Sequence, residues 1–114
     1  MTSIIEYLIA ELSEAFAPVP VRAERPEKLP EAFVIVEWIG AGEADHIRSA
    51  TVAVQTYAGR MVDALQMCET AIEAMQALPD KNRVTAVELN SAYNYTDEEE
   101  HMYRYQAIFN LTHY

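Results

Sequence analysis

The sequence predicts a single α+β domain, residues 1–114, with two helices packed on a mainly antiparallel sheet of about four or five strands. Two segments carry apolar residues at helical spacing, and four others alternate or are rich in β-branched and aromatic residues. A length of 114 residues and a hydrophobic content of 51% suit one domain with a core of its own. The single cysteine, Cys68, excludes an internal disulfide.

The first helix is predicted over residues 3–16, where apolar side chains recur on one helical face. Ser3 and Glu6 form a capping-box pattern, in which the hydroxyl and the carboxylate satisfy exposed backbone donors at the start of the helix. Pro18 and Pro20 then prevent continuation of the helix and favour an extended path.

A hairpin is predicted in the next part of the chain. Residues 22–31 are charged and contain prolines, which indicates a surface loop. Residues 32–39 are rich in Phe, Val, Ile and Trp and form a predicted strand, which Gly40 and Gly42 are expected to end. Residues 43–46 would be the hairpin turn or a longer protruding loop.

A second strand and the second helix follow. Residues 47–57 alternate at period two, which is typical of a half-buried strand, and Gly59 breaks the pattern. Helix two is predicted over residues 60–78. Its buried face is expected to hold Met61, Leu65, Cys68, Ile72 and Met75, with Ala64 and Ala71 beside them.

Two further strands are predicted at the end of the chain. Pro79 closes helix two, and residues 84–89 alternate as a strand. Residues 94–101 form a loop with a run of four carboxylates, and residues 102–114 form a long final strand. Two helices covering one largely antiparallel sheet would bury all of these apolar faces.

Composition excludes several classes of partner. The formal net charge is -10, which argues against a nucleic-acid binder and against adhesion to an anionic membrane surface. No basic region followed by an apolar block begins the sequence, and the longest apolar run, residues 32–36, is far too short to span a bilayer. The expectation is therefore a soluble protein made in the cytoplasm.

The residues that could bind a metal ion or act in catalysis also have purely structural explanations. The run from Asp97 to Glu100, followed by His101, suits a divalent cation, but a solvated or partner-facing charge run is the main prediction and a weak Mg²⁺ or Ca²⁺ site is the alternative. The three histidines lack zinc-site spacing, and Cys68 lies on an apolar helix face, where it packs as a small hydrophobe. Phosphate-binding glycine loops and nucleophile elbows are absent from the sequence, so no catalytic residue, metal or cofactor is assigned.

Aromatic residues in the predicted strands are interpreted mainly as packing. Trp38, Tyr103 and Tyr105 could stack on a ligand, but strand aromatics usually pack in the protein. Arg104 lies between two tyrosines and should project from the opposite face of the strand. It either pairs with an acidic residue across a subunit boundary or stays exposed and unpaired.

Several segments resemble those of small phage tail-completion and tail-terminator proteins, over nearly the whole chain. The ending YRYQAIFNLT (residues 103–112) is similar to their last strand, where an Arg-Tyr-Gln-Ala type segment precedes alternating apolar residues. FVIVEW (33–38) and VAVQTY (52–57) resemble earlier strands, and NYTD (94–97) resembles the polar-aromatic loop before the final strand. The N-terminal helix, the proline-marked stretch and the second helix are similar too.

The resemblance implies a ring homo-oligomer, commonly a hexamer, which caps the growing tail tube and presents a surface to the head connector protein. It implies no catalysis, and it places the protein in the bacterial host cytoplasm during assembly and then in the virion tail or neck. Subunit or partner contacts are expected on the loop before the final strand and on that strand, at Asn94, Tyr95, Asp97, Arg104, Tyr105 and Gln106.

The acidic loops lead to a further hypothesis. A ring around a DNA conduit must not hold the passing DNA, so negative charge near its lumen would be useful. Residues expected to face the lumen or a partner are Glu43, Asp45, Glu98, Glu99 and Glu100. Subunits are expected to join through sheet edges and loops, because an open sheet leaves edges that must be covered.

Two alternatives remain open. One is another completion or adaptor protein of the head–tail junction, and the other is a small α+β ligand-binding or regulatory domain. A ring in negative-stain images would favour a tail part, and binding to tube ends would identify which part. A deep apolar pocket with converging polar groups would favour the ligand-binding domain.

Overall fold

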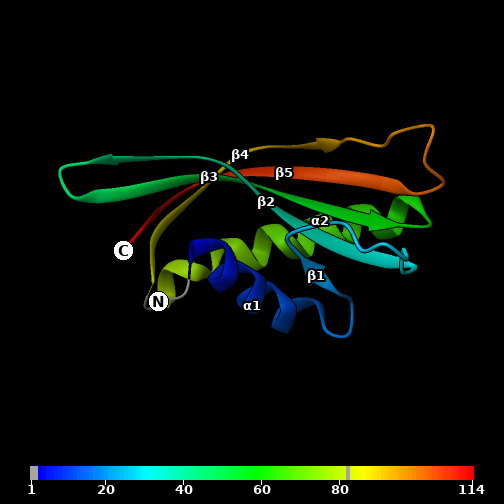
Figure 1. Cartoon of the computed structure of the whole chain (residues 1–114), viewed down its shortest axis with the longest axis horizontal. Coiled ribbons are helices and arrows are strands. Elements are labelled where there is room, and N and C mark those ends of the chain that lie inside the picture. The colour runs from blue at the N-terminus through cyan, green and yellow to red at the C-terminus, as the bar shows by residue number, and fades with distance from the viewer. Residues whose placement is uncertain (1–2, 82) are drawn as a thin grey trace.

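The computed structural model describes residues 3–81 and 83–114, and its fold is α+β, as predicted. Two helices lie on the same side of a five-stranded sheet (Figure 1). The elements in chain order are α1 (Ile4–Phe16), β1 (Val21–Arg22), β2 (Ala32–Ala44), β3 (Ile47–Ala58), α2 (Met61–Gln76), a short 3-10 helix (Leu78–Asp80), β4 (Val84–Asn94) and β5 (Tyr103–His113).

The sheet has the order β1-β2-β3-β5-β4. All neighbouring strands are antiparallel except β1 and β2, which are parallel and pair over two residues. The last strand of the chain therefore lies inside the sheet, between β3 and β4. Because β1 is so short, most of the outer edge of β2 and the whole outer edge of β4 carry no neighbouring strand within the described chain.

Helix α1 begins and packs as predicted. Ser3 is its N-cap, and the Ser3 hydroxyl oxygen accepts a hydrogen bond from the backbone N–H of Glu6 at 3.1 Å, which is one of the two bonds of a capping box. Leu8, Leu12 and Phe16 are buried at helical spacing against the sheet and α2. The predicted amphipathic face is confirmed.

The buried face of α2 agrees with the prediction at Cys68 and Met75 and differs from it at Met61 and Leu65. Met61 and Leu65 are exposed, whereas the buried side chains are mostly small: Ala64, Cys68, Ala71 and Met75. The Thr56 hydroxyl of β3 donates a hydrogen bond to the backbone carbonyl of Ala64 at 2.9 Å, so strand and helix backbones lie close together. Small side chains at these positions permit that approach, and the larger residues Met61, Val62 and Leu65 at the start of the helix are turned outward.

Strand β2 continues past the two glycines that were expected to end it. Its pairing with β3 shifts register between Trp38 and Gly40 and then continues to Ala44. Asp45 and His46 form the turn, with φ of 51° and 67°, the left-handed geometry of tight two-residue hairpin turns. We call residues 37–49 the hairpin arm. Its tip extends beyond the helices in Figure 1, and its residues are exposed or half-buried.

The two faces of the sheet are packed differently. The face toward the helices carries the main core, which includes Val34, Val52, Val54, Phe109 and Leu111. The opposite face has a small separate core of Phe33, Ile35 and Tyr57, with Met102 packed against it. Helices leave this outer face uncovered, so the loops at one end of the sheet must shield its apolar residues.

Candidate interaction site

A polar network lies on the outer face of the sheet. We call Gln55, Tyr57, Tyr93, Arg104 and Gln106 the outer-face cluster. Register places their strands side by side, with Gln55 opposite Gln106, Tyr57 opposite Arg104 and Tyr93 opposite Gln106. These positions alternate with residues of the main core, so their side chains share the face away from the helices.

Hydrogen bonds run through the outer-face cluster in one direction. Arg104 donates to the Tyr57 hydroxyl at 2.9 Å, and that hydroxyl donates to the Gln55 amide oxygen at 3.1 Å. Gln55 then donates to Gln106 at 2.7 Å, and Gln106 donates to the Tyr93 hydroxyl. Linked bonds of this kind polarise one another and favour a single arrangement of the side chains.

Arg104 has its partners within the chain. Its guanidinium lies over the Tyr95 ring at 4.4 Å and the Tyr57 ring at 5.4 Å, and its Nε donates to the Tyr95 carbonyl at 2.8 Å. Within the described chain the side chain is therefore half-buried and held by tyrosines, which differs from the expectation of an exposed, unpaired arginine; pairing with an acidic residue across a subunit boundary stays a prediction. Stacking between two tyrosines suits a planar guanidinium.

The loop between β4 and β5 is ordered by its own polar side chains. Asn94 accepts a hydrogen bond from the Thr96 N–H, and the Thr96 hydroxyl contacts both the N–H and the carbonyl of Arg104. Further along, the Asp97 carboxylate accepts from the Glu99 N–H at 3.0 Å. The sequence-predicted contact residues Asn94 and Asp97 thus hold the loop in shape.

An ion pair joins two loops above the aromatic stack of the outer face. Phe33 and Tyr57 stack with ring centroids 4.3 Å apart, and the Arg25 guanidinium lies 5.5 Å from the centre of the Tyr57 ring. Arg25 makes two hydrogen bonds to the Glu100 carboxylate, at 2.7 and 3.0 Å, which raise the pKa of Arg25. Glu100 is therefore the acidic residue of this loop that forms an ion pair within the described chain.

The remaining predicted contact residues on β5 are mostly internal. Tyr105 is half-buried and packs against the main core, and Gln106 is buried within the outer-face cluster. Tyr95 keeps 46% of its surface exposed. Of the contact residues suggested by the resemblance, the structure leaves the loop members, Asn94, Tyr95 and Asp97, open to a partner.

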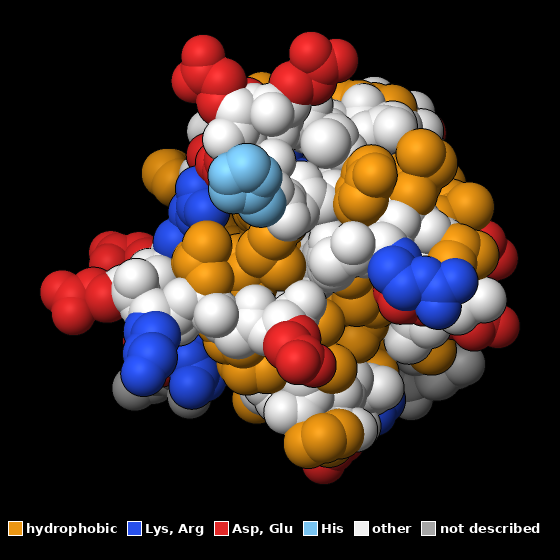
Figure 2. All heavy atoms as spheres, turned by 90° about the vertical axis from the view of Figure 1, so that its right-hand side faces the viewer, with side chains coloured by type: hydrophobic (Ala, Val, Ile, Leu, Met, Phe, Trp, Pro, Cys, Tyr) orange, Lys and Arg blue, Asp and Glu red, His pale blue; other side chains and the backbone are white. Residues whose placement is uncertain are grey.

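The predicted acidic residues fall into two groups that lie at different ends of the sheet. Glu43 and Asp45 are at the tip of the hairpin arm, whereas Glu98 and Glu99 lie in the loop between β4 and β5. That loop is at the right-hand end in Figure 1, and Figure 2 shows this end with acidic side chains at its upper rim and hydrophobic side chains below. Sequence reasoning could not separate the two groups, because their distance depends on strand order.

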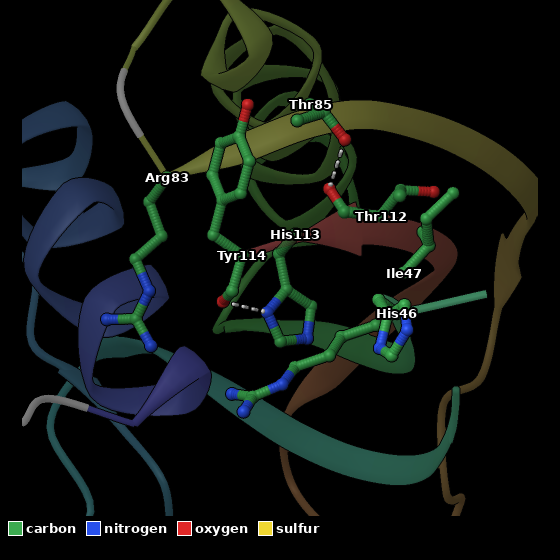
Figure 3. Close-up of a pocket in the computed structure, with 8 residues that line it drawn as sticks. His46, Ile47, Arg83, Thr85, Thr112, His113 and Tyr114 are labelled. Atoms are coloured by element: carbon green, nitrogen blue, oxygen red, sulfur yellow. Dashed lines mark hydrogen bonds between the residues drawn. The ribbon is translucent and has the colours of Figure 1, made fainter. Parts of the chain in front are cut away.

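The structure also brings together a cationic pocket that sequence reasoning missed. It is a hollow of about 740 Å³ between the arm tip, the start of β4 and the end of β5. Four of its lining side chains are arginine or histidine: His46, Arg48, Arg83 and His113. Figure 3 shows Arg83, which directly precedes β4, and His113 at the end of β5, with His46 across the hollow on the arm. These residues are up to 67 positions apart, so spacing gave no signal.

The hairpin arm carries an exposed apolar surface that the sequence did not predict. Trp38, Ile39 and Ile47 are each more than half exposed, at 53%, 52% and 56%. Trp38 was interpreted as ordinary strand packing, which the structure contradicts, because the arm extends past the helices that would have covered it. The sequence carries no clear signal of the arm, because Gly40 and Gly42 were expected to end the strand before it.

Three further findings concern the described residues and the chain. Among the described residues, no group of three or more histidine, cysteine, aspartate or glutamate side chains is arranged to hold a metal ion. Neither α1 nor α2 has the length and apolar character that crossing a bilayer requires. No protein-family model and no curated protein sequence matches this chain.

Proposed function

We propose that this chain is a structural protein of the phage or prophage tail-terminator type. In this proposal it forms a ring, commonly a hexamer, that caps the tail tube and joins it to the head connector, and it performs no catalysis. Support comes from the resemblance of its strands and loop to that family, together with an element order that agrees with the resemblance. The host cytoplasm during assembly and the virion neck are its proposed locations.

The hairpin arm is the observation that carries this proposal. A two-stranded ribbon is marginally stable in water when nothing packs against it. Here the ribbon exposes Trp38, Ile39 and Ile47, and burial of each would contribute about 2 kcal/mol. A monomer gains nothing from such an arm, whereas a subunit that lays the arm on a sister copy stabilises both.

The edges of the sheet support the same proposal and favour β2 as the joining edge. Strand β4 has register shifts between Val84 and Ala86 and between Leu89 and Ser91, irregularities that blunt an edge against pairing. The arm part of β2 has one shift, between Trp38 and Gly40, and then pairs regularly with β3 to Ala44. Its outer backbone groups are therefore the better placed for a neighbouring subunit.

The charge of the chain fits a ring through which DNA passes. A net charge of -10 would keep the phosphate backbone from adhering to the lumen. Asp97, Glu98 and Glu99 are exposed, so they are available to face a lumen or a partner subunit. Replacing these three carboxylates with alanine is expected to alter tube capping or DNA passage; unchanged assembly and infectivity would count against this part of the proposal.

Negative-stain microscopy of the purified protein, alone and mixed with tail tubes, tests the proposal. The expected result is rings of uniform size, with density at tube ends. The Trp38→Glu variant should lose the rings, whereas Trp38→Phe, which keeps an apolar arm, should retain them. Rings that ignore tube ends but bind a connector would favour the neighbouring junction protein. A monomer at every concentration, with and without tubes, would refute the proposal.

A further inference from the structure

The cationic pocket concentrates positive charge in an acidic chain. Two of the eight lysines and arginines and two of the three histidines line it, and no aspartate or glutamate is among its described lining residues. Thr85 and Thr112 add hydroxyl groups between them, and the Thr85 hydroxyl donates to the Thr112 carbonyl at 3.1 Å. Figure 3 shows these groups gathered around one hollow. The lining suits an anionic group.

The two arginines of the pocket have no carboxylate partner within the described chain. Its ion pairs are Arg25 with Glu100 and Lys81 with Glu11. Arg83 lies over the Tyr7 ring at 5.6 Å, a contact that leaves its N–H donors available. Arg48 is exposed on the arm; Glu43 faces it across the hairpin register without forming one of these ion pairs.

Two exposed carboxylates, Glu43 and Asp45, lie on the arm beside the pocket, and a second exposed group, residues 97–99, lies at the other end of the same molecule. Residues 97–99 precede the start of β5, and His113 of the pocket is at its end. Eleven strand residues span about 33 Å, so a subunit's own loop does not reach its own pocket. The loop is already ordered by the bond from Glu99 to Asp97 and by the Arg25–Glu100 ion pair, so little entropy is lost when it docks.

We propose that the acidic loop, residues 97–99, of one copy docks into the cationic pocket of the next copy. This inference rests on the self-assembly in the proposed function and names one contact of it. Arginine forms two parallel hydrogen bonds with a carboxylate, so Glu98 and Glu99 supply acceptors that match Arg48 and Arg83. The two surfaces are different and lie at opposite ends of β5. The contact is therefore head-to-tail, the type that generates a ring when its rotation closes.

Charge reversal tests the contact by sedimentation of the full chain at low salt. The Arg48→Glu and Glu98→Arg variants should each weaken self-association on the order of tenfold, and the double variant should recover most of the loss. Both positions are exposed, so folding should be unaffected. Lys28→Glu and Glu69→Arg make the same charge changes at exposed positions outside the pocket and the loop, and they should leave the association unchanged.

The outcomes separate this contact from the proposed function. If wild type forms rings and both reversals leave ring formation intact, the contact is refuted while the ring stands. The contact is also refuted if the double variant associates more weakly than both single variants. If Arg48→Glu abolishes binding of inorganic phosphate measured by calorimetry but leaves assembly unchanged, the pocket serves a free anion instead. If wild type never associates, alone or on tubes, the proposed function fails and the contact with it.

Discussion

Replacing Arg104 with alanine should destabilise the folded subunit. The guanidinium of Arg104 joins β5 to β3 through the Tyr57 hydroxyl and to the loop after β4 through the Tyr95 carbonyl. It also stacks on both tyrosine rings. Since all of these partners belong to the same chain, the loss should appear in the unfolding of a monomer, before any subunit contact is considered.

The expected loss in the free energy of unfolding follows from the four contacts of the Arg104 guanidinium. Two well-placed hydrogen bonds from a half-buried cation contribute about 1 kcal/mol each, and two cation–π contacts at a partly exposed site contribute about 0.5 kcal/mol each. Arg104→Ala should therefore lower the free energy of unfolding by about 3 kcal/mol. Arg104→Lys keeps the charge but loses the planar fork, so about half of that loss is expected.

Urea unfolding at a concentration where the protein is monomeric measures this loss. A double-mutant cycle with Tyr57→Phe, which removes the shared hydroxyl, should give a coupling energy of about 1 kcal/mol. Arg22→Ala, at an exposed arginine of β1, is the control and should change stability by less than about 0.5 kcal/mol. A loss below about 1 kcal/mol for Arg104→Ala, combined with weakened self-association, would show that Arg104 acts at a subunit boundary instead.

Three further outcomes are expected. Ser3→Ala removes the cap of α1 and should cost about 1 kcal/mol in thermal unfolding, whereas Ser13→Ala inside the same helix should cost nothing comparable. Ala71→Leu should cost roughly 2 kcal/mol or more, because Ala71 is fully buried in the main core, and the same change at exposed Ala10 should be nearly neutral. Burial raises the pKa of the Cys68 thiol above its ordinary 9.0. The thiol of the unfolded chain therefore ionises at a lower pH than that of the folded chain, and the free energy of unfolding should decrease as the pH rises above about 9. Urea unfolding should show a steeper decrease for the wild type than for the Cys68→Ala variant, and equal slopes would contradict this.

The local sequence pattern determined which segments form helices and strands and, for most of them, which face is buried. Alternation along the final strand placed Ala107, Phe109 and Leu111 on the core face, and the cap at Ser3 marked the start of α1. These predictions succeeded because the period of side chains along a helix or strand is a property of the backbone alone. Element ends were less accurate: hydrogen bonds to β3 carried β2 through Gly40 and Gly42.

Tertiary structure decided which surfaces the elements share. The stripe of α2 that is buried depends on how closely the helix approaches β3, so Ala64 and Ala71 lie at its centre, whereas Met61 and Leu65, which were expected there, are exposed. Strand order brings Arg48, Arg83 and His113 into one pocket and separates it from the acidic loop by the length of β5. Residues far apart in sequence meet only through strand pairing, and no local pattern encodes which strands become neighbours.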